Sequence, residues 1–129
     1  MQLDIVSNLF SIIHNAESVR KRECIINPIS KLAGNILRVL QREGYVGEFE
    51  YIDDGRGGKF RIQLLGRINK SRSVTPRFPV GVSDLADEAK RLLPSRDMGI
   101  IIVSTSSGLK THRECLKERV GGVLVGYVY

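Results

Sequence analysis

Apolar residues near the start of the chain recur at the spacings of a helix and then of a short strand. Over residues 4–16 they return every three or four positions, which predicts an opening helix with one buried face. That face carries Ile5, Leu9, Ile12, Ile13 and Ala16. Residues 24–26 form a short apolar run that ends at Asn27-Pro28, a pattern typical of a buried strand.

A second helix is marked at both of its ends. Ser30 is placed to cap its first turn, because a serine oxygen accepts hydrogen bonds from the first free amides of a helix. Gly44 ends it, because glycine takes the left-handed closing conformation without strain. The residues that we expect to face inward are Leu32, Ile36, Val39 and Leu40.

Two alternating segments follow the second helix. Apolar and polar side chains alternate over residues 45–52 and again over 59–64, and the glycine-rich segment 53–58 between them is typical of a turn. The two segments therefore predict a β-hairpin. With the preceding elements it closes an α-β-α-β-β unit.

The second half of the chain predicts a helix and two strands. Residues 83–93 have a capping serine, early acids and late bases, and Pro94 stops this helix. Residues 99–103 are a continuous run of mostly β-branched side chains, as expected for a strand covered on both faces. Residues 123–129 predict a final strand.

A fourth helix is predicted from a capping box. Thr111 and Glu114 have the threonine-x-x-glutamate spacing that satisfies two backbone amides at a helix start. Gly121-Gly122 is expected to end this helix. The chain is thus predicted to be α/β (α+β), with a small α/β domain over residues 1–66 and a second, mainly β domain with short helices over 67–129.

Composition narrows the class of partner. The chain has 129 residues, of which 42% are hydrophobic, and this composition indicates a folded protein. Its formal net charge of +6 favours a polyanionic partner, and composition alone would also allow an anionic membrane. Between Asp54 and Asp84 there is no acidic residue. The bases in this interval are Arg56, Lys59, Arg61, Arg67, Lys70, Arg72 and Arg77. Such a segment of one sign creates a local field that a mixed surface lacks.

Several other classes are disfavoured. No apolar run approaches the roughly 20 residues of a membrane span, and the first residues lack the features of a signal peptide, so we expect a cytoplasmic protein. A metal site would need more ligands than the two histidines, His14 and His112, supply, and we expect neither a metal nor another cofactor. Cys24 and Cys115 are expected to be free thiols.

Aromatic side chains offer two possible roles, because a ring can fill a core or stack on a base. Phe49 and Tyr51 share one face of a predicted strand whose partner carries Phe60, so we expect these three rings to pack in the core. Phe78 and Tyr129 remain open to either role.

The segment 104–108 is the main candidate for function. Ser104, Thr105, Ser106 and Ser107 place four hydroxyls after the buried strand, and Gly108 permits close backbone approach. Hydroxyls both donate and accept, so such a loop suits phosphate, ribose hydroxyls and the accessible base edges of distorted RNA. Taken alone, the spacing favours an ordinary Ser/Thr turn.

A hydrolase or phosphotransferase is the rival interpretation of the same loop. One serine would act as nucleophile, His112 as its base and Asp97 or Glu114 as the orienting acid. No Gly-x-Ser-x-Gly elbow supports this arrangement, and His112 lies where the helix cap needs a polar residue. We therefore expect no catalytic residue.

Longer stretches of the chain resemble a known family. The segment 103–108, followed by His112-Arg113-Glu114 and by 121–129, is similar to the end of the small-subunit ribosomal protein eight family. Further similarity lies in the opening helix, in 28–32 and in 43–49, and the resemblance extends over essentially the whole chain. Residues 66–70, 76–79 and 93–97 resemble the archaeal and eukaryotic cytosolic branch, and the short termini favour an archaeal member.

The resemblance implies a structural, non-enzymatic protein of the small ribosomal subunit. Members of this family bind the central domain of small-subunit ribosomal RNA directly, beside neighbouring ribosomal proteins, and support assembly and translation. No membrane or small-molecule substrate is implied. The residues expected to bind RNA, partly from the resemblance and partly from the basic interval, are Ser104, Thr105, Ser106, Ser107, Gly108, Asn15, Ser30, Lys31, Lys59, Arg77 and Gly122.

Overall fold

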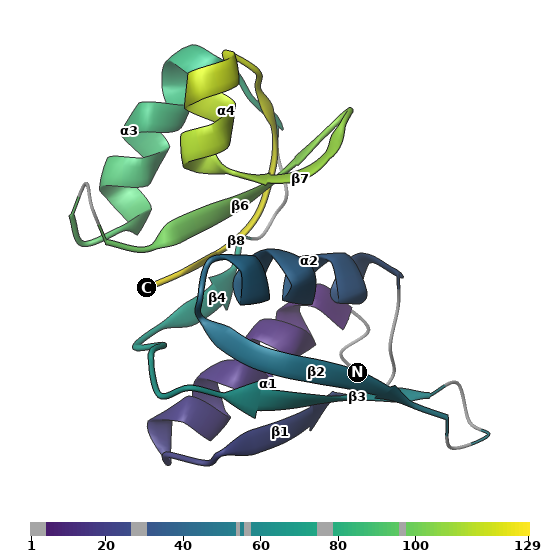
Figure 1. The fold of residues 1–129 in the computed structure, drawn as a ribbon. Coiled ribbons are helices and arrows are strands. Elements are labelled where there is room, and N and C mark those ends of the chain that lie inside the picture. The colour runs from purple at the N-terminus through teal and green to yellow at the C-terminus, as the bar shows by residue number, and fades with distance from the viewer. Residues whose placement is uncertain (1–4, 27–30, 54, 56–57, 75–78, 96–97) are drawn as a thin grey trace. The chain divides into compact units, whose positions relative to one another are not determined.

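Two compact units, Met1–Lys70 and Ser71–Tyr129, make up the chain in the computed structural model. The structure describes residues 5–26, 31–53, 55, 58–74, 79–95 and 98–129. Both units combine helices with an antiparallel sheet, which confirms the predicted α+β class (Figure 1). The predicted domain bounds of 1–66 and 67–129 remain a prediction.

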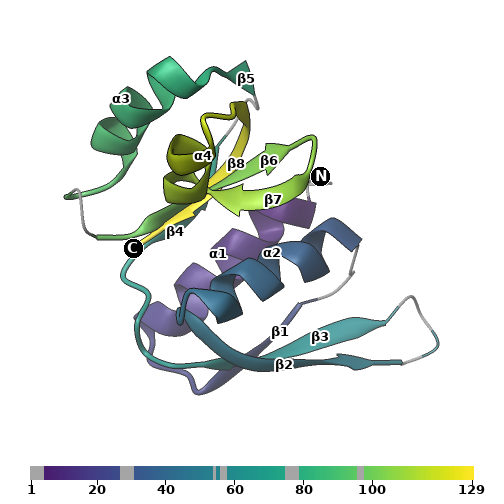
Figure 2. The ribbon, with the colours of Figure 1, turned by 45° about the horizontal axis from the view of Figure 1, so that its top comes forward.

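The first unit is an α-β-α-β-β arrangement, as its apolar pattern predicts. Its elements are α1 (Ile5–Ser18), β1 (Glu23–Ile26), α2 (Lys31–Arg42), β2 (Val46–Ile52) and β3 (Lys59–Leu64). The sheet has the order β1-β3-β2, and Figure 2 shows both helices on one of its faces. The strand β1 was predicted to be buried, but only Cys24 and Ile26 point inward, and Ile25 is exposed. The side chains alternate because this edge strand is covered on one face only.

The buried stripe of α1 differs in part from the predicted one. Leu9, Ile13 and Ala16 are buried as expected, but Phe10 is fully buried and Ile12 is only half-buried. Glu17 is buried in the same helix, and its Oε2 accepts a hydrogen bond of 3.3 Å from the backbone N–H of Ile68. The inward face is therefore rotated toward Phe10 and Glu17.

α2 buries the predicted Ile36, Val39 and Leu40, and it ends where the sequence predicts. Gly44 has a φ of +83°, and the Tyr45 amide donates to the Leu40 carbonyl over 2.9 Å. Leu32 is half-buried, and Ala33 and Leu37 take inward places that the prediction did not include. The predicted cap Ser30 lies outside the described residues.

The hairpin of β2 and β3 is confirmed, with Tyr51 opposite Phe60 and Glu50 opposite Arg61. Phe60 contacts both neighbouring rings edge-on, with centroids 5.6 Å from Phe49 and 6.3 Å from Tyr51. The expected core packing is wrong for Tyr51, which is 55% exposed, because this end of the strand extends past the core.

The second unit contains more strands than the sequence predicts. Its elements are β4 (Ser71–Ser73), β5 (Pro79–Val80), α3 (Val82–Leu92), β6 (Ile100–Thr105), β7 (Gly108–Thr111), α4 (His112–Glu118) and β8 (Gly122–Val128). The sheet order is β4-β8-β6-β7, and β5 also pairs with β8. β4, β5 and β7 were not predicted, because two to four residues are too few to show a strand period.

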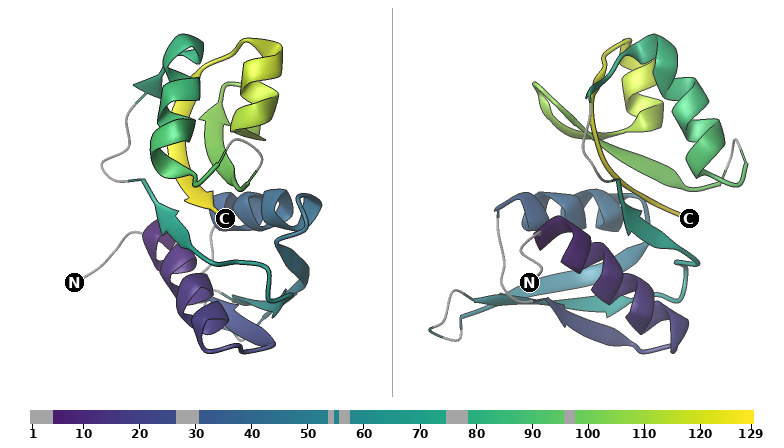
Figure 3. Two further views of the ribbon diagram at one scale, coloured as in Figure 1. Left: turned by 90° about the vertical axis from the view of Figure 1, so that its left-hand side faces the viewer. Right: turned by 180° about the vertical axis from the view of Figure 1, so that it is seen from behind.

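Helices α3 and α4 cover one face of this sheet, as the two views of Figure 3 show. Under them, Ile101 and Val103 of β6 join Leu124 and Tyr127 of β8 in the core. Ile100 and Ile102, which alternate with them along β6, are also buried, and this confirms a strand covered on both faces. Among the described helices, none is long and apolar enough to cross a membrane.

The ends of the two helices correct the sequence predictions. The N-cap of α3 is Gly81, so Ser83 lies inside the helix and does not cap it. The Thr111–Glu114 capping box of α4 is confirmed. This helix ends at Arg119, which takes the left-handed conformation with a φ of +58°, and not at Gly121-Gly122.

Candidate nucleic-acid interface

The predicted loop 104–108 is the tip of a tight β-hairpin. Ser104 and Thr105 end β6, Gly108 begins β7, and Thr105 lies opposite Gly108 in the ladder. Only Ser106 and Ser107 form the turn, and both are exposed. The hydroxyl groups therefore lie on a hairpin whose strand ends are held by backbone pairing and not on a loose loop.

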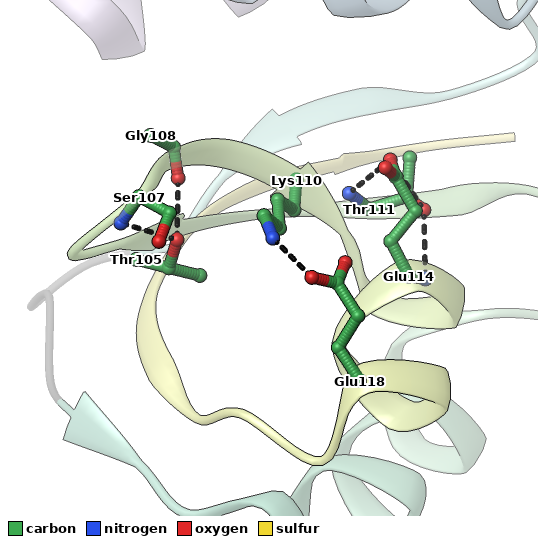
Figure 4. Close-up of polar contacts among 7 residues, drawn as sticks. All are labelled: Thr105, Ser107, Gly108, Lys110, Thr111, Glu114 and Glu118. Carbon is green, nitrogen blue, oxygen red and sulfur yellow. Dashed lines mark hydrogen bonds and ion pairs between the residues drawn. The ribbon is translucent and has the colours of Figure 1, made fainter.

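Thr105 holds this turn together from inside. Its Oγ1 donates to the carbonyl oxygen of Gly108 over 2.8 Å and accepts from the amide of Ser107 over 3.1 Å (Figure 4). The single hydroxyl proton is thereby used, so an RNA group can only donate to this oxygen. Thr105 fixes the geometry in which Ser106 and Ser107 are presented.

Gly108 completes the turn because its backbone conformation suits glycine alone. Its φ is +111°, in a region that other residues rarely adopt. A Cβ added there would meet nothing within 4 Å, so the space beside it is open to solvent. A ligand can approach the backbone closely at this point.

Gly122 lies beside the hairpin for a different reason. It begins β8, and a Cβ at this position would lie 2.4 Å from the carbonyl oxygen of Ser104 and 2.8 Å from Val103 Cγ1. A side chain would therefore force β8 away from β6 next to the tip. The structure brings Gly122 together with residues 104–108, and it assigns Gly122 a packing role.

An ion pair connects the hairpin to α4. Lys110 on β7 contacts Glu118 over 2.5 Å, and this bond is the main reason why the pKa of Lys110 is raised (Figure 4). The sequence prediction missed both residues, since β7 itself was missed. Two residues of turn between Thr105 and Gly108 were the available signal for a hairpin.

His112 is committed to the fold at the other end of β7. Its ring is buried, and its Nδ1 accepts the backbone N–H of Ile101 over 3.1 Å. Burial, followed by the nearby Arg113, lowers its pKa to about 4, so the ring is neutral at pH 7. Glu114 is bound to Thr111 in the capping box, and Asp97 lies outside the described residues. Of the groups that this catalytic arrangement would use, His112 and Glu114 are therefore both engaged inside the fold.

Both cysteines are free and buried. Burial is the main cause that raises the pKa of Cys24 to about 11, and the carboxylate of Glu17 adds to it. Burial also raises the pKa of Cys115. The thiols are therefore protonated at neutral pH and are poor nucleophiles.

Three other expected RNA-binding residues are among those that the structure describes. Asn15 is exposed on α1, Lys31 is exposed at the start of α2, and Lys59 is half-buried at the start of β3. All three belong to the first unit, whereas residues 104–108 belong to the second. Ser30 and Arg77 lie outside the described residues.

The basic interval is less uniform in space than along the chain. Arg61 forms an ion pair with Glu50 across the β2–β3 ladder, and Arg67 donates to the carbonyl oxygen of Gly44 over 3.4 Å. Arg72 is exposed on β4. Glu50, 11 positions before Arg61 in the sequence, thus neutralises part of the positive field that the sequence predicted.

Comparisons with known proteins identify the family. The model of the family described as "Ribosomal protein S8" matches residues 4–129. The small ribosomal subunit protein uS8 of Saccharolobus solfataricus is 54% identical over 127 residues, covering 96% of each chain. The uS8 protein of Caldivirga maquilingensis is 54% identical over 129 residues, covering 100% of this chain and 99% of the relative.

These relatives confirm the predicted archaeal branch. The described residues contain no group of three or more His, Cys, Asp or Glu side chains that could hold a metal ion. With a family match along nearly its whole length and relatives that share more than half of its residues, the chain belongs to the ribosomal protein S8 family.

Proposed function

We propose that this protein is a structural component of the cytoplasmic small ribosomal subunit and binds small-subunit ribosomal RNA directly through the β6–β7 hairpin. The observation that carries the proposal is the exposed Ser106-Ser107 turn, which Thr105 holds in one conformation. Its relatives are named as proteins of the small ribosomal subunit. The proposed partners are RNA and neighbouring ribosomal proteins, and no catalytic step is assigned.

The chemistry of the turn suits an irregular RNA helix. A regular A-form helix hides the base edges of its deep, narrow major groove, whereas distorted segments make those edges accessible as well. The Ser106 and Ser107 hydroxyls can each donate and accept, so they can follow such a surface without a net charge. Because the turn is held from inside, little conformational entropy is lost when it binds.

In this proposal, the affinity for RNA and the position of the protein on the RNA come from different parts of the protein. The net charge of +6 provides attraction to phosphates that weakens with added salt. Lys31 is one exposed base that contributes to it. The neutral hairpin sets the position on the RNA, and we assign its target to the central domain of the small-subunit RNA, whose folding the protein supports.

The experiment is a binding titration against a central-domain RNA fragment and a scrambled RNA of equal length. Ser106→Ala with Ser107→Ala should weaken cognate binding by about 1–3 kcal/mol with little change in salt slope. Lys31→Ala should flatten that slope by roughly one unit. Ser83→Ala, the same change at an exposed serine of α3, is the matched control and should leave both unchanged.

Equal losses on cognate and scrambled RNA for the double serine variant would contradict the proposal. A loss equal to that of the Ser83→Ala control would contradict it as well. Footprinting on the central-domain fragment then tests the target: protection elsewhere in the RNA, with the central domain unprotected, would reject that assignment.

A further inference from the structure

A groove between α3 and α4 lies outside the hairpin and has no part in the RNA binding proposed above. It has a volume of about 600 Å³, within the range of protein binding clefts. Its apolar floor consists of Ala86, Ala89, Leu93, Pro94 and Leu116. The groove exists because α3 buries only Leu85 within its own length and presents alanines where longer side chains would close the gap.

The rim of this groove carries positive charge on both sides. Lys90 of α3 and Arg113 of α4 line it, and no acidic side chain is among the described lining residues. Both cations are exposed. An occupant with carboxylates next to apolar side chains would therefore be complementary to floor and rim together.

The floor argues for protein and against RNA as the occupant. The lining residues include no Phe, Tyr or Trp, so bases would find none of those aromatic surfaces to stack on. Two cations are few for a phosphate backbone, whereas exposed aliphatic side chains exclude water best against other apolar side chains. Leu116, at 36% exposed, is the largest apolar side chain left uncovered on this floor.

A small-molecule ligand is also a poor fit. His112 lines the groove, but its Nδ1 already accepts the Ile101 amide inside the fold. The remaining polar groups are two flexible cations and Ser95, which do not form the convergent set that orients a small ligand.

We propose that the α3–α4 groove docks an apolar segment flanked by carboxylates from a neighbouring protein of the small subunit. The apolar residues of that segment cover Leu116 and the alanines, and its carboxylates face Lys90 and Arg113. The inference uses the place of the protein in the ribosome, and it does not depend on which residues contact the RNA.

Site-specific photocrosslinking in assembled small subunits tests this docking. Leu116 is replaced by p-benzoylphenylalanine, the particles are irradiated, and the crosslinked partner is mapped by mass spectrometry. We expect one neighbouring protein, crosslinked within a segment that has apolar residues and at least one Asp or Glu. Crosslinking to RNA, to a second copy of this chain, or to nothing would overturn the proposal.

A second experiment reverses the charges on the rim of the groove. Lys90→Glu with Arg113→Glu should lower the crosslink yield about tenfold, because two rim attractions become repulsions. Lys117→Glu, the same change on α4 outside the groove, is the matched control and should lower it less than about twofold. Equal yields from the rim variant and the control would also overturn it.

Two further measurements distinguish a loss of docking from unfolding and from a loss of RNA binding. Circular dichroism melting of each variant shows whether it is folded, and Leu116→Gln serves as a second, milder probe if the rim variant is not. Leu116→Gln should lower the yield of a crosslinker placed at Ala86, and an unchanged yield counts against docking. Binding to the central-domain RNA fragment should stay within twofold of the unmodified protein, so failure of the RNA proposal and failure of this one are distinguishable.

Discussion

The two hairpins of this protein are built from the same backbone ladder but differ in what they present. The β2–β3 hairpin carries charges on its open face, and Glu50 is paired with Arg61 across the strands. The β6–β7 hairpin has a neutral hydroxyl turn, and the β6 strand that leads into it is buried from Ile100 to Val103. A charged hairpin attracts any molecule of opposite charge, whereas a neutral turn with a fixed conformation binds only a surface of complementary shape.

The difference has a physical origin in rigidity. Thr105 ties its own turn with two hydrogen bonds, His112 ties β6 to the end of β7, and Gly122 lets β8 approach β6 closely. The β2–β3 hairpin has a longer connection with the local bond from the Gly55 amide to Asp53. Changes that loosen the β6–β7 hairpin should therefore cost more, in stability and in binding, than equal changes in the β2–β3 hairpin.

The largest effect should come from Gly122→Ala. Its methyl group would meet the Ser104 carbonyl oxygen at 2.4 Å, so β8 must shift away from the hairpin. We expect a loss of about 3 kcal/mol in the free energy of unfolding, measured by urea titration. Gly34→Ala is the control, since its Cβ lies 3.4 Å from Phe60 in a helix interior, and a similar loss there would contradict the explanation.

Acid should loosen the same hairpin through His112. The folded protein keeps this ring neutral down to about pH 4, while the unfolded chain binds a proton near 6.5. The contribution of neutral His112 to the free energy of unfolding is therefore fully present above about pH 6.5, and it is lost as the pH is lowered toward 4. Between pH 7 and 5 the loss should be about 2 kcal/mol, measured by urea titration.

His112→Asn isolates this contribution. An asparagine oxygen can accept the Ile101 amide but does not titrate between pH 4 and 7. The variant should be less stable at pH 7 and should lose less than the unmodified protein between pH 7 and 5. An equal loss in both proteins would show that His112 is not the responsible group.

A smaller effect is expected from Thr105→Val, which keeps the shape of the side chain and removes both internal hydrogen bonds of the turn. Binding to the central-domain RNA fragment should weaken by about 1–2 kcal/mol, because Ser106 and Ser107 are no longer held in place. Thr105→Ser keeps the hydroxyl and should restore most of the affinity. If both substitutions weaken binding equally, the hydroxyl does not act as the brace.

The smallest effect should come from the β2–β3 hairpin. Glu50→Gln breaks the exposed ion pair with Arg61 and should change the free energy of unfolding by less than about 1 kcal/mol. Adding salt should reduce the difference further. A loss as large as that of Gly122→Ala would reverse the comparison between the two hairpins.

Much of the fold followed from the sequence where the signal was local. The Thr111–Glu114 box, the left-handed Gly44 and the buried run of β6 each depend on a few adjacent residues, and each is confirmed. Ser83 failed as a cap because Gly81 begins α3 earlier, and capping by one serine is a weak signal. The end of α4 at Arg119 was missed because a non-glycine residue rarely takes the left-handed conformation.

The candidate site was located by sequence but not resolved by it. The sequence placed four hydroxyls and a glycine together at 104–108, and family resemblance gave them a role. It did not distinguish Thr105, which turns inward to brace the turn, from Ser106 and Ser107, which are exposed. That distinction depends on where β7 begins, and a strand of four residues has no period to reveal it.

The sequence by itself determined the helical stripes, the buried strand, the hydroxyl segment, the positive charge and the family, because each depends on residues near one another along the chain. Only the tertiary structure decided that Arg61 is paired with Glu50, that Lys110 contacts Glu118, and that Gly122 lies against Ser104. Strand pairing joins residues by position in space, and one step of register would change every partner. The groove between α3 and α4 arises in the same way, because both helices pack on one face of the sheet and so lie beside each other.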